Sequence, residues 1–175
     1  MKKLFYPVAA ALIISASAFT VATAPKWKIN EEYSVKFSSG HPDGIFKGLK
    51  GDIEFDEKDL KSSVFNVTID VATINTGNGM QNTHAKSDKW FDAEKYPVIK
   101  FTSSQVTKSV AGYQVKGVLE MHGVTKEISF PFTFHNNTFA GSFEVNRNEF
   151  GIGDPKHEKV PATLKIDLSI PVSKS

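Results

Sequence analysis

The chain has 175 residues, a length typical of one domain, and contains no cysteine, which excludes a disulfide framework and a thiolate zinc site. Removal of a predicted N-terminal leader, which contains Lys2 and Lys3, would leave 19 basic and 19 acidic residues and a mature formal charge of zero. A neutral chain whose one arginine is Arg147 has no sequence-wide electrostatic reason to bind nucleic acid or an anionic membrane surface.

The first residues are typical of a secretory leader. Lys2 and Lys3 precede a short apolar run over residues 4–14, and small residues follow. The run is too short to span a bilayer comfortably, so we expect a signal peptide, with an uncleaved membrane anchor as the alternative. The mature protein is then periplasmic or secreted and has no integral membrane segment.

Two stretches in the leader, 16–18 and 22–24, have the small-x-small pattern that precedes cleavage. Cleavage after Ala24 would make Pro25 the first mature residue, which favours a cut near Ala18. We expect a signal peptide over residues 1–24, cut between 18 and 24, and one domain over residues 25–175.

The rest of the chain alternates apolar and polar residues with a period of two, which predicts half-buried strands. Eight candidate strands follow in chain order: 27–38, 44–56, 63–71, 98–107, 111–122, 125–135, 138–147 and 160–171. Most neighbours are joined by only a few residues, which suits antiparallel hairpins because parallel pairing needs a long crossover.

Four of the strands have one clearly apolar face. These faces are formed by Phe65, Val67 and Ile69; by Tyr113, Val115, Leu119 and Met121; by Ile128, Phe130, Phe132 and Phe134; and by Leu164, Ile166, Leu168 and Ile170. Strands with one dry face need an enclosure, so the pattern predicts an all-β barrel or sandwich. Pro131 cannot donate a ladder hydrogen bond, which places its strand at an edge, a seam or a bulge.

One long stretch, 78–92, breaks the alternation and ends in Trp90 and Phe91. We interpret it as a loop with a short helix that caps one end of the sheet. A connection of this length in a compact domain is often functional.

Local signatures of catalysis or metal binding are missing from the sequence. The five histidines, His41, His84, His122, His135 and His157, are scattered without the spacing of a zinc site. There is no Gly-x-Ser-x-Gly elbow, and the glycine-rich stretch 40–51 lacks the ending of a phosphate loop. We expect no catalytic residue, no metal and no cofactor, although a site assembled from distant residues leaves no local signature.

The fourteen phenylalanines fall mostly on inward strand faces. A small eight-stranded barrel is either filled by its side chains or encloses one ligand, and alternation alone does not distinguish the two. Dry faces usually pack against each other, so the pattern by itself favours a filled core.

Three segments resemble the YceI family of exported, lipocalin-like polyisoprenoid-binding proteins. They are His84 to Asp92 with Tyr96 to Phe101, Tyr113 to Lys126, and Arg147 to Gly153. With the opening strand Trp27-Lys28-Ile29, the resemblance covers essentially the whole mature chain. Where the family often has His-Ser in its first strand, this chain has Tyr33-Ser34, so we expect a different mouth.

The resemblance implies an eight-stranded antiparallel, lipocalin-like barrel with a short helical capping segment and an apolar tunnel for an isoprenoid or fatty-acyl lipid. We expect non-catalytic binding, storage or transport, with His84 and Lys86 near the polar mouth. The expected tunnel residues are Phe65, Val67, Ile69, Trp90, Phe91, Phe101, Val115, Leu119, Met121, Phe130, Phe132 and Phe134. Two alternatives remain: a filled barrel that docks a periplasmic partner protein, and an enzyme acting on a small lipid. A homodimer through the Pro131 strand is also left open.

Overall fold

The computed structural model describes residues 24–40, 43–156 and 160–175. The predicted leader, apart from Ala24, lies outside the described residues. His41 and His157 lie outside them as well. Among the described residues, no helix is long and apolar enough to cross a membrane.

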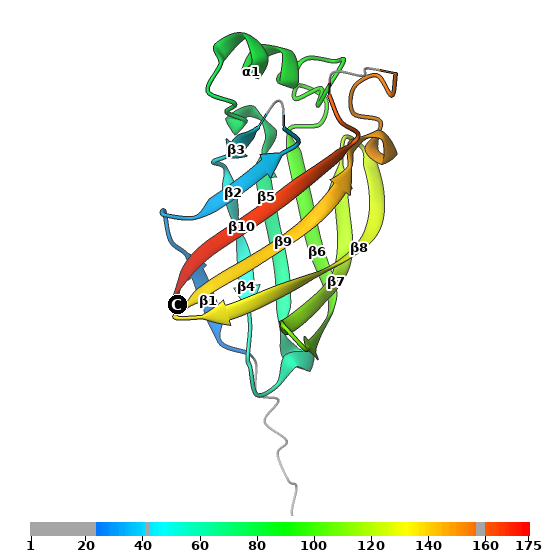
Figure 1. Cartoon of the computed structure of the whole chain (residues 1–175). Coiled ribbons are helices and arrows are strands. Elements are labelled where there is room, and N and C mark those ends of the chain that lie inside the picture. Colours follow the sequence, from blue (N-terminus) through cyan, green and yellow to red (C-terminus); the bar gives the residue numbers. More distant parts are fainter. Residues whose placement is uncertain (1–23, 41–42, 157–159) are drawn as a thin grey trace, which may run out of the picture.

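The described residues form ten antiparallel strands (Figure 1). They are β1 (Lys26–Ile29), β2 (Ser34–Ser38), β3 (Gly44–Phe46), β4 (Leu49–Glu54), β5 (Val64–Asp70), β6 (Val98–Ser109), β7 (Gly112–Met121), β8 (Val124–His135), β9 (Thr138–Asn146) and β10 (Thr163–Lys174). In the order β1-β4-β5-β6-β7-β8-β9-β10, with β1 paired to β10, eight strands close into a ring. The predicted eight-stranded antiparallel barrel is confirmed.

The first two expected strands, 27–38 and 44–56, are each broken in two, which corrects their predicted continuity. β1 pairs with the end of β10 and β2 with its middle, so together they occupy one position in the barrel wall. The same holds for β3 and β4, which pair with β2 and β1 respectively. At Gly48, between β3 and β4, a Cβ would lie 2.6 Å from the Cβ of Asp70, so a glycine is needed for the chains to approach this closely.

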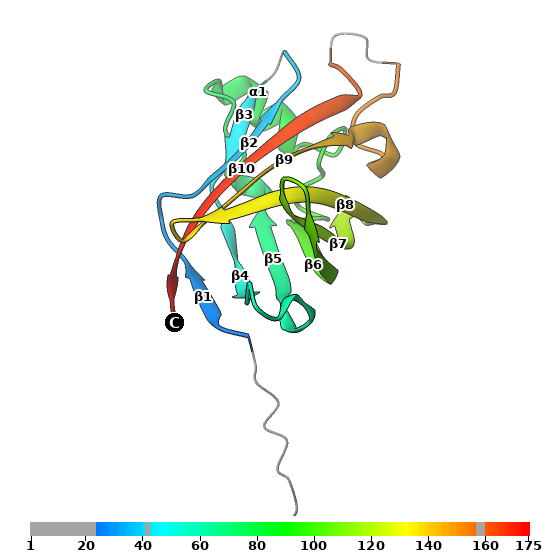
Figure 2. The same cartoon turned by 60° about the horizontal axis from the view of Figure 1, so that its bottom comes forward.

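The wall has a seam between β8 and β9. These strands pair only from Phe132 and Gly141 to the hairpin end, so residues 124–131 and 142–146 have no ladder between them. Figures 1 and 2 both show the two ribbons diverging from the hairpin. Pro131 lies next to the last pair, as predicted for a residue without an amide proton.

One end of the barrel is filled by aromatic rings. Phe55, only 1% exposed, has its ring centroid 5.1 Å from those of Tyr113 and Phe134 and 5.3 Å from that of Phe139. Such edge-to-face contacts are favoured by the ring quadrupoles and leave little empty space. We call the cluster of Phe55, Phe65, Tyr113, Phe132, Phe134 and Phe139 the aromatic floor.

The opposite end is covered by helix α1 (Gly79–Lys86), as Figure 1 shows. Asn78 caps this helix, because its side-chain oxygen accepts hydrogen bonds from the amides of Met80 and Gln81. The expected capping helix is therefore present. The described residues also contain three short 3₁₀ helices: Leu60–Ser62, Val71–Thr73 and Arg147–Phe150.

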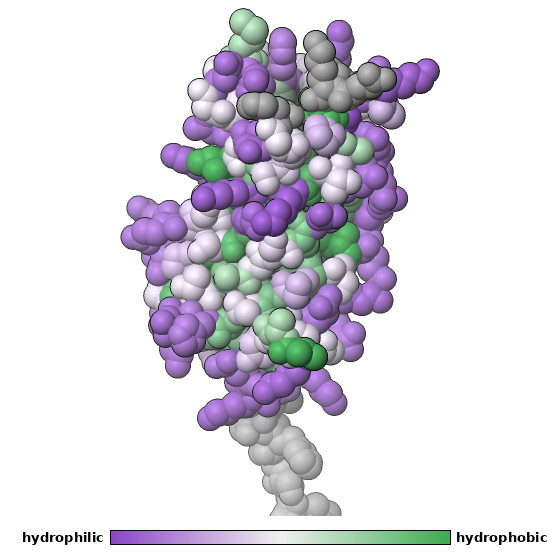
Figure 3. Space-filling model, in the orientation of Figure 1, coloured by the Kyte–Doolittle hydropathy of each residue, from purple (hydrophilic) through white to green (hydrophobic). Residues whose placement is uncertain are grey.

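The face of the molecule drawn in Figure 3 carries many hydrophilic side chains, with neutral and apolar ones between them. The large hydrophobic residues exposed in the described part of the chain are Val64, Met80, Val98, Val110 and Val118. The inward rows predicted from the alternation hold most of the apolar side chains.

Candidate ligand cavity

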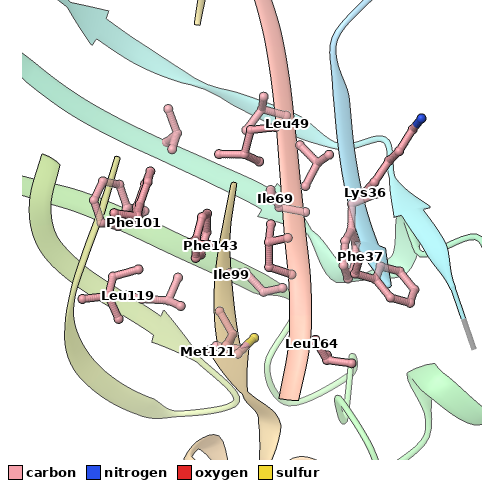
Figure 4. Close-up of a pocket in the computed structure, with 18 of the residues that line it drawn as sticks. Lys36, Phe37, Leu49, Ile69, Ile99, Phe101, Leu119, Met121, Phe143 and Leu164 are labelled. Carbon is pink, nitrogen blue, oxygen red and sulfur yellow. The ribbon is translucent and has the colours of Figure 1, made fainter. Parts of the chain in front are cut away.

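A cavity lies inside the barrel between the helical cap and the aromatic floor. The space open to the centre of a water molecule is about 160 Å³, and the side chains around it come from nearly every strand (Figure 4). All residues of its wall are apolar except Lys36 and Arg147. A cavity with such a wall favours a hydrocarbon over water, since buried water needs several polar partners.

Lys36 presents its charge outside the cavity. It lies between the inward residues Val35 and Phe37 on β2, and its backbone lies opposite that of Asp167 in the β2–β10 register. In Figure 4 its nitrogen points away from the labelled apolar side chains. Its positive charge helps to lower the pKa of Asp167, after the larger effect of hydrogen bonds from Lys165 and Ser142.

Arg147 is the one charged side chain buried in the cavity wall, with only 2% of its surface exposed. Its guanidinium donates to the backbone carbonyls of Ile152 (2.7 Å), Val160 (2.9 Å), Pro161 (3.1 Å) and Asp154 (3.3 Å). Burial lowers its pKa, and the negative charge of Asp154 opposes this effect. The donors are thus directed at the connection between β9 and β10 and hold it at the end of the barrel that α1 covers (Figure 1), which we call the mouth.

The three segments of the family resemblance meet at this end. The Arg147 guanidinium lies 5.4 Å from the centre of the Trp90 ring, which in turn occupies the space beside Gly153. His122 packs edge-on against Tyr96 at 4.8 Å, and its Nδ1 lies 3.0 Å from the carbonyl oxygen of Phe150. These residues fasten the cap, the β7–β8 turn and the β9–β10 connection together.

A second, smaller space of about 70 Å³ lies toward the aromatic floor. It shares Val67, Phe101, Phe130, Leu168 and Ile170 with the main cavity, so the two spaces adjoin. Small side chains at Ala140 and Gly141 form part of its wall.

The twelve expected tunnel residues divide by their depth in the barrel. The main cavity is lined by Val67, Ile69, Phe91, Phe101, Leu119, Met121 and Phe130, and the smaller one alone by Phe65, Val115 and Phe132. Phe134 packs in the aromatic floor and Trp90 packs against Arg147, so neither lines a cavity.

The two residues expected at the polar mouth, His84 and Lys86, lie on α1 and do not line a cavity. His84 is exposed and Lys86 is half-buried. Among the described residues, no group of three His, Cys, Asp or Glu side chains is placed to hold a metal ion.

The expected set omitted more than half of the main cavity's wall. The omitted residues are Val35, Lys36, Phe37, Phe46, Leu49, Ile99, Ile128, Phe143, Val145, Arg147, Ile152, Leu164, Ile166, Leu168 and Ile170. The alternating row on the last strand was a signal that could have found four of them.

Residues 13–172 match the family model described as "YceI-like domain". A UPF0312 protein of Photorhabdus laumondii is 35% identical over 98% of this chain and 95% of its own length. Protein YceI of Escherichia coli is 29% identical over 93% of this chain and 92% of its own.

Two solved structures have the same fold. BcnA of Burkholderia cenocepacia superposes with a TM-score of 0.77 at 26% identity, over 83% of this chain and 99% of that one. A domain from Saccharophagus degradans, described as polyisoprenoid binding and implicated in plant cell wall breakdown, superposes with a TM-score of 0.62. It is 15% identical, over 85% of this chain and 98% of its own.

Proposed function

The chain belongs to the YceI-like family, and we propose that it binds the hydrocarbon chain of an isoprenoid or other long-chain lipid inside its barrel, for storage or transport and without catalysis. The apolar cavity between the cap and the aromatic floor carries this proposal. Each methylene moved from water into such a space contributes about 0.8 kcal/mol, so a long chain binds firmly without directional contacts.

The charges around the cavity favour a ligand whose polar end stays outside. Arg147 already donates to four carbonyls, and Lys36 faces outward, so neither is directed at a buried head group. An unpaired charge or polar group inside the cavity would be costly. The head group then lies at the mouth, where we propose His84 and Lys86 of the cap as its contacts.

The isoprenoid class draws support from the name of one structural neighbour, the polyisoprenoid binding domain of Saccharophagus degradans. The rings of Phe91, Phe101, Phe130 and Phe143 in the cavity wall are suited to flat unsaturated chains. The flexible side chain of Met121 adapts to different chain shapes.

We propose that the mature protein acts outside the cytoplasm. The leader with Lys2, Lys3 and the apolar run 4–14 supports export. Cell fractionation followed by N-terminal sequencing should find the protein in the periplasm or medium, beginning between residues 19 and 25. A full-length protein in the cytoplasm would contradict export.

A pair of tryptophan variants tests lipid binding. Leu119 lines the main cavity and is buried, whereas its neighbour Val118 is 38% exposed on the outer face of β7. Leu119→Trp should fill the cavity and weaken binding of a fluorescent apolar probe, N-phenyl-1-naphthylamine, by about tenfold or more, the equivalent of roughly two lost methylenes.

Val118→Trp is the matched control and should bind the probe like the unmodified protein. Far- and near-ultraviolet circular dichroism confirm that both variants are folded. Equal probe binding by the two variants, or no binding by the unmodified protein, would contradict the proposal.

A further inference from the structure

The barrel interior is a tunnel that is closed at one end and consists of two adjoining spaces. The larger one extends toward the cap, and the smaller one ends at the aromatic floor. The five residues common to both walls, Phe101 and Phe130 among them, surround the passage between the two spaces. A chain that comes from the capped end reaches the smaller space only after it passes these rings.

Phe65 and Phe132 close the smaller space. Both line it, and their ring centroids lie 5.5 Å apart. Phe139 lines this space as well, 5.4 Å from Phe65, and the buried ring of Phe55, which does not line it, contacts all three. Rings packed this closely do not admit a further methylene without moving, so the chain must end here.

Gly141 keeps the smaller space open, because it has no side chain to fill it. It lies on the inward row of β9 with Phe139 and Phe143, opposite Phe132 of β8 and Leu168 of β10. It also lines the smaller cavity. A Cβ built here would lie 3.0 Å from the backbone carbonyl oxygen of Pro131 and 3.6 Å from the Cβ of Phe132, so a side chain requires the Pro131 carbonyl to move by a few tenths of an ångström.

We propose that Phe65, Phe132 and Gly141 set the length of the hydrocarbon chain that the barrel accepts, with the tail entering first and ending against Phe65. This inference rests on the proposed function and adds a determinant of ligand length to it. It predicts a limit on a single chain, whatever its head group.

The depth of the tunnel gives the limit. The inward residues of β10 that line the two spaces run from Leu164 through Ile166 and Leu168 to Ile170. At about 3.3 Å per residue and a strand tilt of about 40°, this run covers roughly 15 Å of depth. An extended chain advances roughly 1.3 Å per carbon–carbon bond of about 1.5 Å, so roughly twelve carbons fit.

The test measures the affinity of saturated fatty acids that lengthen by two methylenes at a time, by displacement of N-phenyl-1-naphthylamine. In the unmodified protein the affinity should rise about fourfold per methylene up to roughly twelve carbons and then level off. In Phe65→Ala the levelling point should move to longer chains by at least one member of the series. In Gly141→Val it should move to shorter ones.

Phe134→Ala is the matched control, because Phe134 belongs to the aromatic floor but lines neither space. It should lose stability like Phe65→Ala and keep the original levelling point. Phe65→Leu replaces Phe65→Ala if thermal melting shows that the alanine variant is unfolded.

The outcomes separate the two claims. Failure of every chain to displace the probe would overturn the proposed function. Displacement without a levelling point, or a levelling point that stays in place in both Phe65→Ala and Gly141→Val, would overturn the length determinant and leave lipid binding intact.

Discussion

Arg147 holds the connection between β9 and β10 to the barrel, and its replacement by methionine tests this role. Methionine keeps a long apolar stem beside Trp90 but has no donor for the carbonyls of Ile152, Asp154, Val160 and Pro161. These four acceptors then lose their charged partner at once.

The magnitude follows from the burial of the four bonds. A buried acceptor left without a partner costs about 1–3 kcal/mol. Only the bond to Ile152 is fully buried, and the other three are partly buried, so water replaces part of what is lost. We expect Arg147→Met to lower the free energy of unfolding by roughly 3–5 kcal/mol. For a domain of this size the Tm falls by roughly 10 °C.

Urea unfolding and thermal melting of the folded protein measure the effect. Lys156→Met is the control, because it removes a positive charge from an exposed position in the same connection; it should change stability by no more than about 0.5 kcal/mol. A loss of under about 1 kcal/mol in Arg147→Met would refute the assignment, since the bonds would then contribute little.

Three further predictions concern stability and dynamics. Burial, then a hydrogen bond to a carboxylate, raises the pKa of Tyr113 to about 12. Because the folded-state pKa is raised, the protonated hydroxyl stabilises the fold. This stabilisation is complete below the unfolded-state pKa of about 10 and is lost as the pH rises toward 12. The free energy of unfolding should therefore fall more steeply above pH 10 in the unmodified protein than in Tyr113→Phe. Gly51→Ala should cost more than about 2 kcal/mol in urea unfolding, because its Cβ would lie 2.2 Å from a backbone oxygen of β5. Gly77→Ala, also at positive φ but with open space around it, should cost only about 1 kcal/mol. Hydrogen exchange should be faster for amides in 124–131 and 142–146 that face the seam than for amides between β6 and β7, and equal rates would contradict an open ladder.

The alternation of apolar residues predicted the strands because it reports which face of a strand is dry. It could not reveal the break between β1 and β2, since Trp27, Val35 and Phe37 continue the same odd-numbered row through the turn. Between β3 and β4 the inward row changes from Phe46 to Leu49, and this change of parity was a readable signal of a break.

The cavity could be predicted only in part, because periodicity gives the face of a strand but not the depth along it. Phe130 and Phe134 share the inward row of β8, yet Phe130 lines both spaces and Phe134 fills the floor. Only the three-dimensional staggering of the strands separates the two. The wall position of Arg147 was equally hidden, since its partners are backbone carbonyls that leave no pattern in the sequence.

Mass spectrometry of an organic extract is the most direct test of lipid binding. The protein, purified from the cell envelope or medium without detergent, should release one long-chain lipid or isoprenoid per chain, and Leu119→Trp should release much less. A protein that yields no lipid and takes up no added isoprenoid would contradict the account.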